Sequence, residues 1–158
     1  MSNPAPTPER AAELLSAVAA ADDPFPALDA ALGEVIGHKL FTIMAIDWAA
    51  EEAGRVYTNM PDAYPVKGKK PLGTMTEWGA HVIEGQQPFI GYDAADIARV
   101  FPDHETIAAL GCASVLNVPV IRDGRVIATL NLLHEAGFYA PPDAARATPF
   151  AEAVAPRL

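Results

Sequence analysis

The 158-residue sequence has a single cysteine and no long apolar run. Cys112 cannot form an internal disulfide, which agrees with a reducing compartment. No apolar stretch approaches the roughly 18 residues of a membrane-spanning helix. The N-terminal residues 1–10 have neither the basic start nor the apolar centre of a signal peptide. We therefore expect a cytoplasmic protein.

Positive charge is also scarce. Eleven Lys and Arg residues face twenty Asp and Glu residues, for a formal net charge of −9. This charge repels both nucleic acid and anionic lipid, so neither a nucleic acid nor a membrane is an expected partner. The one basic cluster is Lys67-Gly68-Lys69-Lys70. It could hold an anionic ligand group or a partner's carboxylate, or it could be a solvated loop.

Apolar residues, by contrast, are plentiful. They make up 51% of the chain while charged residues make up 20%, which is typical of a folded domain. No internal repeat or linker divides the sequence. We expect a single domain over residues 1–158, with a flexible tail over residues 1–7 and a core over residues 24–154.

Capping patterns predict the helices. Thr7 before Pro8 starts a helix over residues 8–20, and Asp23 before Pro24 starts a second one that Gly37 can end. The capping box over residues 74–77 predicts a helix that continues to residue 84. Further short helices are expected after Asp93 and Asp103, together with a weak last helix that becomes regular only from Pro149 onward.

Apolar runs predict the strands. Residues 40–46 form a uniform run, and residues 55–59 alternate after a polar turn at 51–54. Residues 60–72 are expected to form a loop with one short strand, and residues 88–90 another short strand. Two longer runs flank Asp123-Gly124, a pair that supplies the positive φ angles of a tight hairpin. Pro119, in the first run, must lie at a sheet edge or a bulge.

This order of elements indicates an α+β fold, and two motifs add a family resemblance. Val118-Pro119-Val120, the polar turn and the run from Gly124 to Leu130 resemble the last strand pair of GAF domains. The segment 138–143 is similar to the family's entry into its last helix. The resemblance implies a GAF-like (profilin/PAS-like) antiparallel sheet with helices on both faces. It also implies that the N- and C-terminal helices pack together and offer a surface for a homodimer.

In GAF domains a small molecule typically lies between one sheet face and the segment after the second strand, here about residues 60–112. Aromatic and histidine side chains in that segment, and an amide in the next strand, suit ligand binding. The candidate ligand-binding residues are Tyr64, Trp78, His81, Tyr92, Phe101, His104, Cys112 and Asn117. Asn131 is an equivalent amide in the other hairpin strand. For the aromatics and histidines, a place in the core or a structural hydrogen bond is the alternative.

The spacing of the histidines does not predict a metal site, and the sequence leaves any cofactor unknown. Phe101-Pro102-Asp103-His104 resembles a segment of free methionine-R-sulfoxide reductases, which are GAF proteins. Where that family has cysteine after the histidine, this chain has Glu105-Thr106-Ile107-Ala108. A resolving thiol is missing as well.

These features favour a binding function. The main interpretation is a sensory domain for an unidentified small molecule, which signals by dimerisation or through a separate signalling protein. One alternative is a small enzyme of the sulfoxide reductase type that uses Cys112 and His104. Another is a ligand-free protein-interaction module.

Overall fold

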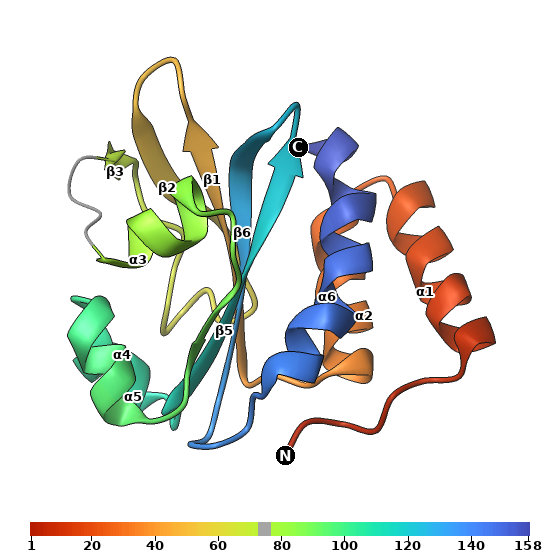
Figure 1. Ribbon diagram of the computed structural model, residues 1–158, viewed down its shortest axis with the longest axis horizontal. Helices are drawn as coiled ribbons and strands as arrows, with labels where there is room; N and C mark the ends of the chain where they lie inside the picture. The colour runs from red at the N-terminus through yellow and green to blue at the C-terminus, as the bar shows by residue number, and fades with distance from the viewer. Residues whose placement is uncertain (73–76) are drawn as a thin grey trace.

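The computed structural model describes residues 1–72 and 77–158. Within these residues, a six-stranded antiparallel sheet has the order β3-β2-β1-β6-β5-β4. The strands are β1 (Leu40–Asp47), β2 (Glu52–Thr58), β3 (Lys70–Pro71), β4 (Phe89–Gly91), β5 (Ser114–Arg122) and β6 (Arg125–His134). The long central strands β1, β6 and β5 separate two layers of helices (Figure 1).

One sheet face is covered by long helices and the other by short ones (Figure 1). The long helices are α1 (Pro8–Ala20), α2 (Pro24–Val35) and α6 (Pro141–Val154), which continues into the 3-10 turn η3 (Ala155–Arg157). The short elements are α3 (Glu77–Gly79), the π-helical turn η2 (Ala80–Glu84), α4 (Ala94–Val100) and α5 (His104–Ala109). Helix α1 packs on α2 and α6. The α+β class and the packing of the terminal helices are therefore confirmed.

Local capping explains the first helices. The Thr7 side chain accepts a hydrogen bond from the backbone N–H of Arg10, and Asp23 does the same for Phe25. Both helices begin at the proline that follows the cap, as predicted. The predicted start of the next helix, over residues 74–76, lies outside the described residues. In the stretch expected to be a flexible tail, Asn3 is bonded through its backbone N–H to the Ile36 carbonyl at 2.8 Å.

The predicted hairpin is confirmed. Asp123 and Gly124 have φ angles of 53° and 76°, and Arg122 pairs with Arg125 on either side of them. Pro119 pairs with Thr129 of β6 on one side. On its other side β4 pairs with Val115, Leu116 and Asn117. Among the described residues β5 is therefore a sheet edge at Pro119, where no N–H is needed.

Two boundaries differ from the prediction. Strand β2 already begins at Glu52, inside the predicted turn, and its Gly54 lets the chain at Lys69 come close: a Cβ on Gly54 would lie 3.3 Å from the Lys69 Cα. Helix α6 runs through Pro149 instead of becoming regular there. Pro149 is exposed, so its ring projects from the helix without displacing core side chains.

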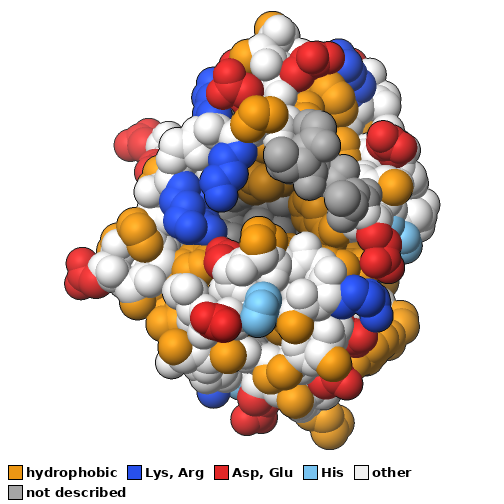
Figure 2. Space-filling model, turned by 90° about the vertical axis from the view of Figure 1, so that its left-hand side faces the viewer, with side chains coloured by type: hydrophobic (Ala, Val, Ile, Leu, Met, Phe, Trp, Pro, Cys, Tyr) orange, Lys and Arg blue, Asp and Glu red, His pale blue; other side chains and the backbone are white. Residues whose placement is uncertain are grey.

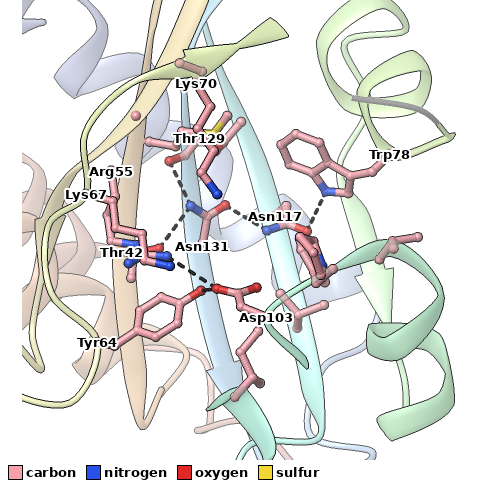
Figure 3. Close-up of a pocket in the computed structure, with 18 of the residues that line it drawn as sticks. Thr42, Arg55, Tyr64, Lys67, Lys70, Trp78, Asp103, Asn117, Thr129 and Asn131 are labelled. Atoms are coloured by element: carbon pink, nitrogen blue, oxygen red, sulfur yellow. Dashed lines mark hydrogen bonds and ion pairs between the residues drawn. The ribbon is translucent and has the colours of Figure 1, made fainter. Parts of the chain in front are cut away.

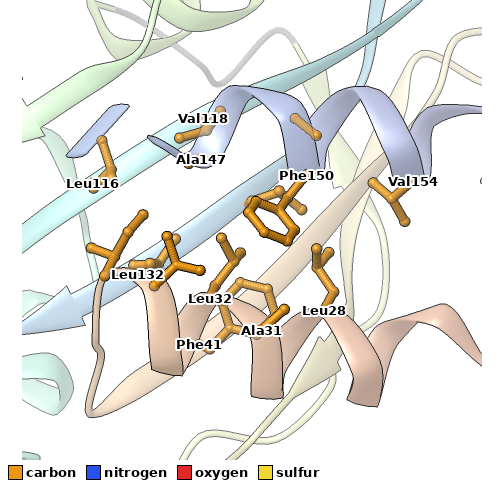
Figure 4. Packing of buried hydrophobic residues seen from close by; sticks show 14 of the residues in the cluster. Leu28, Ala31, Leu32, Phe41, Leu116, Val118, Leu132, Ala147, Phe150 and Val154 are labelled. Atoms are coloured by element: carbon orange, nitrogen blue, oxygen red, sulfur yellow. The ribbon is translucent and has the colours of Figure 1, made fainter. Parts of the chain in front are cut away.

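The main core lies between the sheet and the long helices (Figure 4). Phe41, Leu116 and Leu132 face Leu32 of α2 and Phe150 of α6 in this layer. Successive strand residues point to opposite faces. The residues between these core positions therefore point toward the short helices, and there the sequence places polar side chains.

Candidate functional site

A cavity of about 480 Å³ lies between the sheet and the short helices. It opens to the surface as a hollow with Lys and Arg side chains along one edge (Figure 2). Apolar side chains from β1, β5, β6, α4 and α5 form much of its wall, among them Met44, Val115, Leu133, Val100 and Ile107. This volume is within the range of pockets that bind small molecules.

A row of polar side chains crosses the floor of this cavity. Thr42 of β1 lies opposite Asn131 of β6, which in turn lies opposite Asn117 of β5. The Asn117 amide nitrogen donates to the Asn131 side-chain oxygen at 2.7 Å, and the Asn131 amide nitrogen donates to the Thr42 hydroxyl at 3.1 Å. Trp78 extends the row, because its Nε1 donates to the Asn117 oxygen at 2.9 Å (Figure 3).

The floor of the cavity also holds a buried polar group that is not satisfied. Asn117 is 2% exposed and Thr129, which also lines the cavity, is 0% exposed. The Thr129 hydroxyl has no hydrogen-bond partner in the described part of the chain. Buried polar groups without a partner are rare because each costs about 1–3 kcal/mol. A bound molecule or water in the cavity would supply the missing bond.

Three charged or polar side chains from separate segments meet at one side of the cavity. Arg55 of β2 lies 3.6 Å above the ring centroid of Tyr64 and 3.5 Å from the Asp103 carboxylate. The Tyr64 hydroxyl donates to the same carboxylate. Burial and this hydrogen bond raise the pKa of Tyr64 well above its usual range. The cluster ties the segment before α5 to β2 and to the loop that follows β2.

Asp103 therefore has a different role from the one predicted. Its side chain makes no capping hydrogen bond to α5, although α5 does begin at the next residue. The carboxylate is turned toward Tyr64 and Arg55 instead. Asp93 does cap α4, by accepting from the Asp96 N–H at 3.0 Å. The difference arises because the partly buried Arg55 guanidinium competes with the helix terminus for Asp103.

The basic cluster is divided by the fold. Lys67 and Lys70 line the cavity, where Figure 3 shows Lys70 above the polar row and Lys67 beside Arg55 at the Thr42 end of the row. Lys69 lies outside the lining and pairs with Asp47 at 3.0 Å. In residues 1–72 and 77–158, neither Lys67 nor Lys70 forms an ion pair.

The structure brings together four of the eight candidate residues. Tyr64, Trp78, Phe101 and Asn117 line the cavity. His81 and Tyr92 line a second, more open hollow of about 510 Å³ beside β4. There His81 hydrogen-bonds the Pro88 carbonyl at 2.8 Å, the structural alternative considered for this residue.

His104 and Cys112 lie outside the lining of both hollows. Cys112 is 3% exposed and packs among apolar residues that include Leu40, Ile97 and Val115. Burial raises the pKa of its thiol, so little thiolate is present at neutral pH. This environment is typical of an inert structural cysteine.

Sequence reasoning missed Arg55, Asp103, Thr42 and Thr129 as site residues. The threonines carried a signal, because Thr129 and Asn131 are polar positions with a spacing of two in an apolar strand. Arg55 and Asp103 had no such signal, since their contact depends on tertiary structure alone.

The described residues contain neither a cluster of metal-binding side chains nor a membrane-spanning helix. No group of three or more His, Cys, Asp or Glu side chains that could hold a metal ion occurs in residues 1–72 and 77–158. Over the same ranges, no helix has the length and apolar character needed to cross a membrane.

No protein-family model matches the sequence, and no curated protein matches it either. Solved structures do resemble it. The GAF domain of a phosphoenolpyruvate-protein phosphotransferase from Coxiella burnetii has a TM-score of 0.73 and 18% identity, and the match covers 94% of this chain and 89% of that one.

Two further structures are similar over 94% of this chain. Free methionine-R-sulfoxide reductase from Neisseria meningitidis has a TM-score of 0.68 and 20% identity, with 86% of that chain covered. The chromophore-binding domain of a bacteriophytochrome from R. palustris has a TM-score of 0.71 and 11% identity, with 59% of that chain covered. The helix-covered antiparallel sheet described above is the fold of GAF domains.

Proposed function

We propose that this chain is a sensory domain that binds a small molecule in the cavity above the polar row. The observation that carries the proposal is the buried Thr129 hydroxyl, which lines the cavity without a hydrogen-bond partner among the described residues. The adjacent row from Trp78 to Thr42 offers further polar atoms in fixed positions. Apolar walls with a few placed polar groups are typical of ligand sites.

Native mass spectrometry of gently purified protein tests this proposal. A ligand held in the cavity adds a discrete mass that disappears on denaturation. A thermal-shift screen of metabolites then identifies further ligands, since a ligand at 100 times its dissociation constant adds about 2.7 kcal/mol of stability. Asn117→Leu is expected to weaken the binding of every ligand identified in these two experiments. The absence of both an added mass and any thermal shift would overturn the proposal in favour of a protein-interaction module.

The enzymatic alternative has weaker support. The likeness to free methionine-R-sulfoxide reductase concerns the fold. Cys112 lies outside the cavity lining, and burial raises its pKa. A thiol mechanism predicts turnover of free methionine sulfoxide with a reductant, and loss of that turnover in Cys112→Ala. We expect no turnover in either protein.

The proposed output is a change in association with a second chain. Either another copy docks on the exposed surfaces of α1 and α6, which pack together, or a separate signalling protein binds. Sedimentation velocity with and without the identified ligand tests the first route. If the protein stays monomeric at high concentration with and without the ligand, the first route is excluded and the output must pass through a separate signalling protein.

A further inference from the structure

The charges around the cavity are unbalanced in a way that defines the class of ligand. Arg55, Lys67, Lys70 and Asp103 are the charged residues of its described lining. The whole chain, in contrast, carries a net charge of −9. Three cations against one carboxylate therefore make this hollow a positive region on an acidic protein (Figure 2).

The single carboxylate is already neutralised. Asp103 is paired with Arg55 at 3.5 Å and accepts a hydrogen bond from Tyr64. The Arg55 side chain is 13% exposed, and its guanidinium also donates to the Pro65 carbonyl at 2.6 Å. The partly buried Arg55 thus has its partners, and the excess positive charge resides on the two lysines.

The lysines at the rim have no such partners within the described residues. Lys67 and Lys70 lack an ion pair there, whereas Lys69, between them, is paired with Asp47 outside the cavity. The chain therefore separates three neighbouring lysines into one that is neutralised and two that face the hollow. A ligand anion is the group that would complete their environment.

The floor of the cavity also favours a ligand that carries acceptor oxygens. Asn117 uses one of its two amide hydrogens on Asn131, and the hydroxyl of Thr42 accepts a bond from Asn131. The hydroxyl of Thr129 makes no bond in the described structure. The remaining amide hydrogen and the hydroxyl hydrogens are donors, so they suit a ligand rich in acceptor oxygens. Trp78 and Phe101 supply an aromatic wall, with ring centroids 6.2 Å apart.

We propose that the ligand is a small organic anion. Its charged group lies between Lys67 and Lys70, and its body lies over the polar row against Trp78 and Phe101. This inference rests on the proposed function and adds the charge and composition of the molecule. It requires no movement of Asp103, because the lysines are unpaired within the described structure.

Two fluorescent probes of nearly the same shape test the inference. 8-Anilinonaphthalene-1-sulfonate is an aromatic anion, and N-phenyl-1-naphthylamine has the same skeleton without the sulfonate. We expect the anion to bind about tenfold more tightly at low salt, with an advantage that falls as salt is added. Titrations of both probes give the two affinities, and Thr129→Phe, which fills the cavity, shows whether the probes bind there.

Matched lysine variants assign the effect to residues. The double variant Lys67→Gln/Lys70→Gln is expected to weaken the anion about fivefold and to leave the neutral probe unchanged. Lys69→Gln removes the same kind of charge from the same loop, and we expect it to change the anion affinity less than twofold. All three lysines are exposed, so these variants retain the fold.

The outcomes separate the two proposals. Equal binding of the two probes, or an anion affinity that the double variant does not change, overturns the anion inference and leaves the binding function standing. If neither probe binds, or if Thr129→Phe changes neither affinity, both the cavity as a binding site and the anion inference fail. An effect of Lys69→Gln equal to that of the double variant would mean a diffuse surface charge, which also overturns the inference.

Discussion

The side chains of Asn117 and Asn131 face each other across β5 and β6, and the amide nitrogen of the first donates to the oxygen of the second at 2.7 Å. Each amide has a further partner on its outer side, Trp78 for Asn117 and Thr42 for Asn131. The pair is thus the centre of a row in which removal of either amide takes a partner from the residues on both of its sides.

Replacement of Asn117 tests this dependence. Asn117→Leu leaves Trp78 Nε1 and the Asn131 oxygen without their partner, and we expect a loss of about 2–4 kcal/mol in the free energy of unfolding. Urea denaturation measures it. The double variant Asn117→Leu/Asn131→Leu should lose less than the sum of the single variants, because they share one hydrogen bond. Additive losses would show that the two amides act independently.

The raised pKa of Tyr64 predicts that the free energy of unfolding falls at high pH. Burial, and next the hydrogen bond to Asp103, raise its pKa above the value of about 10 in an unfolded chain. Its stabilising contribution is therefore complete below about pH 10 and is lost as the pH rises through the folded-state pKa. Tyr64→Phe should cost about 1–3 kcal/mol at pH 7, a difference that shrinks in alkali. A difference independent of pH would contradict this role.

The lowered pKa of Asp29 predicts that the free energy of unfolding falls at low pH. Burial alone would raise its pKa, but hydrogen bonds from His38 and Tyr57, both at 2.7 Å, outweigh burial and lower the pKa. The contribution is present above about pH 4, the unfolded value, and is lost as the pH falls through the lower folded-state pKa.

Asp29→Asn provides the test of this acid effect. We expect it to destabilise the protein by about 1–3 kcal/mol at pH 7 and by clearly less at pH 2. Chemical denaturation at both pH values measures the difference. Asp22→Asn is the matched control, because Asp22 is exposed and its carboxylate makes no hydrogen bond or ion pair in the described structure. A loss at pH 7 no larger than that of the control would contradict the prediction.

The position of Pro149 predicts that its replacement stabilises the protein. It lies inside α6 and is exposed, so Pro149→Ala restores a helical N–H without opening a cavity. We expect a gain of about 1–3 kcal/mol, measured as a shift of the urea midpoint. Pro142→Ala, in the first turn, should give no comparable gain, because the N–H groups there have no helical partner.

Local signals in the sequence predicted most of the fold. Thr7, Asp23 and Asp93 each cap a helix as expected, and Asp123-Gly124 forms the turn of the main hairpin. Such features depend on residues within one turn of each other. They can therefore be inferred without knowledge of the rest of the chain.

The site was predicted only in part, because its chemistry depends on distant residues. Tyr64 and Asp103 are 39 residues apart, and their contact removes Asp103 from the cap that local spacing assigned to it. His81 and Tyr92 belong to the expected segment but lie at another hollow, beside the edge strand β4. Composition identified the segment, whereas the packing of its short helices and loops on the sheet decides which of its side chains face the cavity.

The direction of the polar row limits how its members can rearrange. Every donor points the same way, from Trp78 through Asn117 and Asn131 to Thr42. Turning over Asn117 alone would set its oxygen against the Asn131 oxygen and its nitrogen against Trp78 Nε1, so Asn117 can turn only if Asn131 turns with it and Trp78 gives up its partner. A ligand that inverts Asn117 of β5 would therefore also turn Asn131 of β6 and change its hydrogen bond with Thr42 of β1, while the backbone stays in place.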